Sequence, residues 1–149
     1  MPEPPFDVAT AHRWFAVEFN NRAWDLIEKE GRTADETQAM IHAAHAAACH
    51  WQAIGTSLNA QRAEGLLATA YLKAGRAEPA LRHAQRGLAL SEQNAEETDF
   101  DRATTLAAAA RAHALAGDAA EAERLLALAM AAAGKLEAED RGVFDKLYG

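Results

Sequence analysis

Apolar residues recur at helical spacing along most of this chain. Each stripe advances by about 100° per residue, as expected for an amphipathic helix. Two stripes are Phe15, Phe19, Ala23, Leu26 and Ile27, and Met40, Ala43, Ala44, Ala47 and Trp51. No stretch alternates β-branched and polar residues before an Asn-Gly or Asp-Gly turn. Alanine, leucine, glutamate, arginine and glutamine are strong helix formers. The sequence therefore predicts an all-α protein.

Glycines divide this helical pattern into hairpins. Gly75 stands where one helix should end, and Pro79 stands in the first turn of the next, the positions where each residue costs least. Gly117 follows Gly75 by 42 residues, and Gly31 precedes Gly75 by 44. We predict three antiparallel hairpins made of six helices, near 8–30, 34–54, 59–74, 78–93, 101–116 and 119–133, with a short seventh helix within 135–149. A four-helix bundle formed by the first two hairpins is the alternative.

Composition and charge narrow the function classes. Half of the 149 residues are hydrophobic and 25% are charged, which suits a single globular domain spanning 1–149. The net charge of −7 argues against a nucleic-acid partner and against an anionic membrane surface. No apolar segment approaches the roughly 20 residues of a membrane span, and the N-terminus lacks a secretion signal. A single cysteine, Cys49, fits a reducing compartment. We expect a cytoplasmic protein.

The motifs that would indicate an enzyme are missing from the sequence. We find no Gly-rich phosphate loop, no Ser/His/Asp arrangement and no pair of catalytic carboxylates. The sequence therefore predicts a non-enzymatic protein without a cofactor.

Potential metal ligands gather on the second predicted helix. His42, His45 and Cys49 stand at i, i+3 and i+7 and share one stripe. This spacing matches no established zinc motif. The alternatives are that the histidines line a helix interface, or that they form a small-ligand or metal site. A helical ligand- or metal-binding protein using this stripe is therefore the alternative function.

A second apolar ridge accompanies the core stripe of the first helix. Trp14, Val17 and Trp24 lie to one side of it. An apolar ridge left at an open end tends to find a partner, so these residues are a candidate two-fold homodimer contact. The competing interpretation is that the ridge packs on the following helices and leaves a monomer.

The two later hairpins share small, aromatic and glycine residues at matching positions. These are Leu67, Ala68, Tyr71, Gly75 and Ala80, then Ala109, Ala110, His113, Gly117 and Ala122. With this pattern the chain resembles the tetratricopeptide repeat family, although its interval of 42 residues exceeds the usual repeat of about 34. The resemblance implies a right-handed stack of hairpins in which Phe144, Leu147 and Tyr148 of the last helix cap the open end.

The same resemblance implies a concave groove, lined by the first helix of each hairpin, that holds a protein or peptide. Carrying the family's groove positions onto this sequence gives Glu18, Asn21, Asp25, Arg62, Thr69, Lys73 and Arg111. The alternative is that these residues form a plain solvated face with ion pairs within each helix. The predicted function is thus a protein or peptide interaction module.

Overall fold

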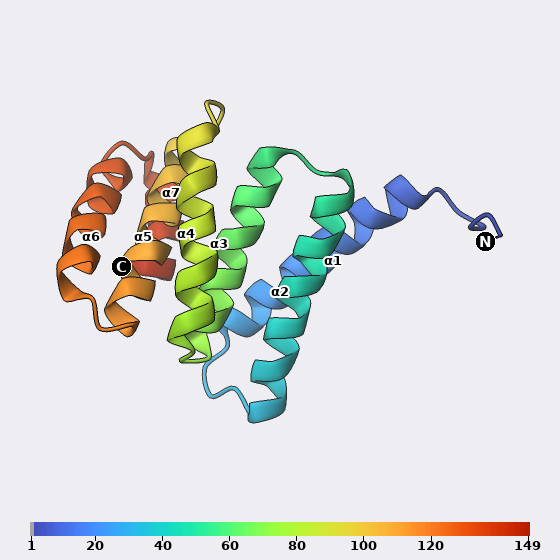
Figure 1. Cartoon of the computed structure of the whole chain (residues 1–149), viewed down its shortest axis with the longest axis horizontal. Helices are drawn as coiled ribbons and strands as arrows, with labels where there is room; N and C mark the ends of the chain where they lie inside the picture. Colours follow the sequence, from blue (N-terminus) through green and yellow to red (C-terminus); the bar gives the residue numbers. More distant parts are fainter. Residues whose placement is uncertain (1) are drawn as a thin grey trace.

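The computed structural model describes residues 2–149, which form seven α-helices and no strand. The helices are α1 (Val8–Glu28), α2 (Ala34–Ile54), α3 (Ser57–Lys73), α4 (Ala77–Gln93), α5 (Asp99–Leu115), α6 (Ala119–Ala133) and α7 (Ala138–Tyr148). The first six pack as three consecutive antiparallel pairs, side by side along the long axis of the molecule (Figure 1). The all-α prediction and the order of the hairpins are confirmed.

The turn inside each pair depends on a left-handed glycine. Gly31, Gly75 and Gly117 have φ angles of 66°, 72° and 89°, a conformation that other residues rarely adopt. In the second turn the amide of Arg76 donates to the carbonyl oxygen of Tyr71, 2.9 Å away, which closes the C-terminal turn of α3. The three predicted helix ends are confirmed.

The helix starts differ in detail from the sequence-based expectation. Thr56 is the N-cap of α3, so this helix begins at Ser57, before the predicted start near 59, and Thr56 forms a reciprocal capping box with Asn59. Thr98 caps α5 in the same way together with Asp101. A threonine is therefore the N-cap of the first helix in the second and in the third pair. In α5 this capping box holds Asp101 at the third residue of the helix.

The paired helices present two unlike faces. α1 contacts α3 and α3 contacts α5, whereas no comparably close contact joins α2 to α4 or α4 to α6 within residues 2–149. The helices α1, α3 and α5 therefore lie closer to one another than α2, α4 and α6 do. We call the surface made by α1, α3 and α5 the inner face.

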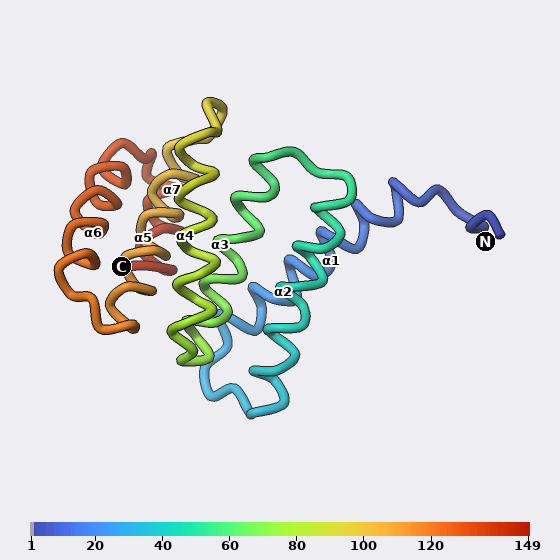
Figure 2. Tube along the Cα trace, in the orientation of Figure 1, coloured from blue at the N-terminus to red at the C-terminus, as the bar shows by residue number. Residues whose placement is uncertain are grey.

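The C-terminal helix α7 lies on the inner face rather than over the outer end of the stack. After α6 the chain turns back and runs beside α5 (Figure 2). The Tyr148 hydroxyl lies 3.0 Å from Thr69 Oγ1 of α3, and Phe144 is buried. The expectation that α7 caps the open end is therefore wrong. Leu126 and Met130 of α6 remain exposed there instead.

Small residues allow the helices to approach closely. Ala80 of α4 is fully buried, and α4 packs both against α3 of its own pair and against α5 of the next. Ala122, at the matching position of α6, is only partly buried and lines a cavity of about 410 Å³ beside Leu126. The repeats thus agree in sequence at this position but differ in packing: α4 lies between α3 and α5, whereas within residues 2–149 α6 packs against α5 alone.

Replacing Ala80 with leucine should lower the free energy of unfolding by about 1–3 kcal/mol, since three additional carbons must enter a closed helix crossing. Ala122→Leu provides the matched control, and its effect should stay within about 0.5 kcal/mol because its side chain enters open space. Urea denaturation of both variants checks this. Equal losses of stability would contradict the difference in packing.

Candidate functional site

A cleft lies on the inner face between α1, α3 and α5, with the end of α7 as one wall. Its volume is about 320 Å³. Its lining, which defines what we call the inner cleft, is Asn20, Trp24, Gln61, Arg62, Gly65, Thr98, Phe100, Asp101, Thr104, Thr105, Leu147 and Tyr148. Aromatic and aliphatic walls with a few converging polar groups are typical of binding sites.

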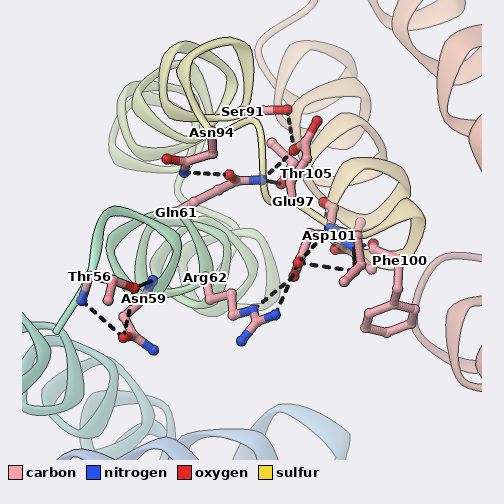
Figure 3. A network of polar contacts seen from close by, with 12 residues as sticks. Thr56, Asn59, Gln61, Arg62, Ser91, Asn94, Glu97, Phe100, Asp101 and Thr105 are labelled. Atoms are coloured by element: carbon pink, nitrogen blue, oxygen red, sulfur yellow. Dashed lines mark hydrogen bonds and ion pairs between the residues drawn. The ribbon is translucent and has the colours of Figure 1, made fainter.

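An ion pair between α3 and α5 forms the polar wall of the inner cleft. Arg62 donates from Nε to Oδ1 of Asp101 over 2.8 Å and from Nη2 to Oδ2 over 3.0 Å (Figure 3). Burial by itself would raise the pKa of Asp101, but the hydrogen bonds from Arg62 and Thr98 outweigh it and leave the pKa below its ordinary value. The carboxylate is therefore charged at neutral pH and holds the guanidinium at the edge of the cleft.

A buried amide network holds the same helices behind this ion pair. Gln61 donates to Glu97 over 2.9 Å and to Thr105 over 3.0 Å, and it accepts from Asn94 over 2.9 Å (Figure 3). Ser91 of α4 donates to the same Glu97 carboxylate. The network joins α3, α4 and α5 through polar groups that satisfy one another, which fixes the cleft walls. Sequence reasoning did not identify it.

Three of the predicted groove residues lie beside or beneath α7. Thr69 is buried under Tyr148, and the Arg111 guanidinium lies 5.6 Å from the centre of the Tyr148 ring. Lys73 lines a neighbouring cavity with Leu147. These positions therefore do face inward, but the chain's own last helix occupies the space in front of them.

The predicted groove residues of α1 are solvated. Asn21 and Asp25 are exposed, and Glu18 forms an ion pair with Arg22 four residues later, at 2.9 Å. This part of the face matches the alternative of a solvated surface with ion pairs inside the helix. Trp24, which was assigned to the dimer ridge, lines the inner cleft instead.

His45 on α2 belongs to a polar cluster between α2, α3 and α4. Its Nε2 lies 2.8 Å from the Tyr71 hydroxyl, and the Tyr71 ring stacks on His83 with planes 3° apart. His83 in turn meets the Glu64 carboxylate at 2.6 Å. Partial burial lowers the pKa of His45, and the neighbouring His83 lowers it further. The contacts of His45 therefore agree with the alternative in which the histidines line a helix interface.

The other two residues of the histidine and cysteine stripe do not join this cluster. His42 is exposed and bonds to Gln38 of its own helix at 3.2 Å, and Cys49 is an exposed free thiol. Among residues 2–149 no group of three or more histidine, cysteine or acidic side chains is arranged to hold a metal ion. The stripe does not bring its three potential ligands together.

The N-terminal part of α1 exposes several large apolar side chains. Trp14 is 60% exposed and Val17 46%, and Phe15 lies against the Trp14 ring. Phe15 and Phe19 also stack on His50 of α2. This aromatic group is thus anchored to α2 on one side and open to solvent on the other.

Among the described residues no helix combines the length and the apolar character that crossing a membrane requires. Comparison of the chain with models of protein families, with curated proteins and with solved structures found no match.

Proposed function

We propose that this chain is a non-enzymatic interaction module, similar to tetratricopeptide repeats, that holds a protein or peptide segment on its inner face. The observation that carries the proposal is the inner cleft, which combines an apolar wall of Trp24 and Phe100 with exposed polar groups. The chemistry fits a peptide segment, because an apolar side chain can enter the cleft while Arg62 and Asn20 bind its backbone or a polar neighbour.

The charge on the cleft rim favours a particular kind of segment. Arg62 is half exposed, and its pairing with Asp101 leaves guanidinium N–H groups available, since a guanidinium has five donors and only two serve this pair. A carbonyl or carboxylate oxygen of the partner can accept from it. We therefore expect a segment that combines at least one large apolar side chain with a nearby acceptor.

A photo-crosslinking amino acid placed at Thr104 tests the proposal in the full chain. Thr104 lines the inner cleft, whereas Gln85 is exposed on α4, outside the inner face, and serves as the control position. A partner should crosslink from Thr104 and not from Gln85. The reverse pattern would place binding on the outer helices and contradict the proposal.

Gly65 allows the inner cleft to be filled without disturbing the fold. A Cβ at this position meets no atom within 4 Å, and glycine is unfavourable inside a helix. With the crosslinked partner purified, Gly65→Leu should weaken its binding at least tenfold, whereas Gln85→Leu should leave the affinity unchanged. Equal affinity of the two variants would show that the cleft is not used.

The alternative function, a ligand or metal protein using His42, His45 and Cys49, is not carried further, because these side chains do not converge within the described residues. The proposed function includes neither an enzymatic activity nor a cofactor.

Self-association through the exposed part of α1 is a separate proposal. Trp14 and Val17 are one helical turn apart and both open to solvent, so two copies can bury them against each other across a two-fold axis. Trp24 is omitted from this contact because it packs against the core. Sedimentation should show a wild-type dimer and a folded monomer of the Trp14→Glu, Val17→Glu variant, with Gln85→Glu still dimeric. A monomeric wild type would end this proposal.

A further inference from the structure

The helix α7 is the shortest helix of the described residues and lies on the inner face. It has 11 residues, and its N-cap residue Glu137 makes no side-chain cap bond. Only Phe144 and Tyr148 within it are buried. An isolated helix of this length is marginal in water, so α7 keeps its conformation mainly through the surface on which it docks.

The buried docking contacts are made by two aromatic side chains four residues apart, and Leu147 packs against the core beside them. Phe144 and Tyr148 pack together with ring centres 5.8 Å apart. The Tyr148 hydroxyl meets Thr69 at 3.0 Å, and Arg111 covers the ring. The outer ion pair, Lys146 with Glu28 of α1 at 3.1 Å, is solvent exposed and therefore contributes little.

Unfilled space surrounds α7 on the inner face. A cavity of about 480 Å³ lies toward α1, where Leu147 faces Ile27 and Lys73. Another, of about 350 Å³, lies toward α5, where Leu72 and Arg111 are among the lining residues. Both are open to solvent, so they are surface grooves along the two sides of α7 rather than voids inside its interface. The inner face is thus wider than the helix that covers it.

We propose that α7 is a displaceable occupant of the inner face, and that the partner is an amphipathic helix carrying two aromatic residues four positions apart, which takes its place. This inference rests on the proposed function and names the conformation and the side chains of the partner segment. The contacts of α7 indicate which groups the inner face can bind. The aromatic pair Phe144 and Tyr148 packs on the surface of α3 and α5, and the hydroxyl of Tyr148 bonds to Thr69. A longer partner helix would also fill the two flanking cavities.

A tethered helix competes with an added one at an effective concentration in the millimolar range. Binding of an external helix should therefore be weak until α7 is loosened. Residues 136–149 of this chain, made as a synthetic peptide, are the probe because they carry the required aromatic pair. The receiving protein is the full chain in its wild-type form and as the Phe144→Ala, Tyr148→Ala variant.

Two measurements on the full chain test the proposal. In wild-type protein, amide hydrogen exchange in α7 should be at least tenfold faster than in the centres of α3 and α5, since α7 opens locally. The peptide should bind the double variant at least tenfold more tightly than it binds wild type. Val143→Ala is the matched control, because Val143 is 44% exposed on α7. The Val143→Ala variant should bind the peptide with the same affinity as the wild-type protein.

The proposal is overturned if α7 amides are as protected as those of α5, which would show that α7 opens only with global unfolding. It is also overturned if the folded double variant fails to bind the peptide. Should that variant not fold, the exchange measurement on wild type decides alone. A chain whose α7 stays closed, yet which crosslinks a partner from Thr104, would keep the proposed function and lose this inference.

Discussion

Replacing Asp101 with alanine should lower the free energy of unfolding by about 2–4 kcal/mol at pH 7, the sum of a lost helix cap and a lost charge-assisted pair. Asp101 is 5% exposed, accepts both arms of the Arg62 fork and completes the capping box with Thr98. Because Arg62 is half exposed, it is resolvated in the variant, which keeps the loss below that of a fully buried pair.

The loss should depend on pH in a defined direction. The pKa of Asp101 in the folded protein lies below its ordinary value, so the carboxylate stabilises the fold above the unfolded-state pKa of about 3.9. This contribution disappears as the pH falls through the lower, folded-state pKa. The difference between wild type and Asp101→Ala should therefore be constant from pH 7 to 5 and shrink below pH 4.

Asp99→Ala is the matched control, because Asp99 is exposed in the same first turn of α5 and makes no pair across the helices. It should cost no more than about 1 kcal/mol, the value of a helix-dipole interaction. Urea denaturation of the three proteins across the pH range gives the comparison. Equal losses for both aspartates, or a difference that grows in acid, would contradict the assigned role of Asp101.

Replacing Gln61 with leucine should lower the free energy of unfolding by about 2–3 kcal/mol, because buried partners are left without their hydrogen bonds. Gln61 is 1% exposed and bonds to Glu97, Thr105 and Asn94. The Glu97 carboxylate would keep the hydrogen bond from Ser91 and the ion pair with Arg102, whereas Thr105 and Asn94 would lose the amide of Gln61. Gln85→Leu, on the exposed side of α4, should leave the urea midpoint unchanged. A Gln61→Leu midpoint equal to that of wild type would show that the network does not hold the cleft walls.

The parts of the fold that depend on local chemistry could be predicted from the sequence. Gly31, Gly75 and Gly117 occupy turns that require positive φ, and this requirement is readable from their position after apolar periodic segments. Thr33 forms a capping box with Glu36, three residues later, which is the spacing that this motif requires. Helix boundaries depend on a few neighbouring residues and can therefore be predicted from the sequence. Because each turn inside a pair is short, the boundaries also predict which helices form each hairpin.

The candidate site depends on contacts between distant residues. Arg62 is one of the predicted groove residues and lines the inner cleft, but its partner could not be predicted. Arg62 and Asp101 are 39 residues apart, and only the relative position of α3 and α5 brings them together. The aromatic pair of α7 indicated a packed helix, but periodicity shows that a face is buried and not which surface buries it. For that reason the predicted end cap lies on the inner face, and Trp24 lines the cleft.

The most direct test of the central claim is the map of amide chemical-shift changes when the crosslinked partner segment is added to the full chain. Our account predicts that the changes concentrate on the inner face, at Trp24, Arg62 and Thr104, and in α7. Changes confined to the outer helices, around Gln85 of α4, would contradict it.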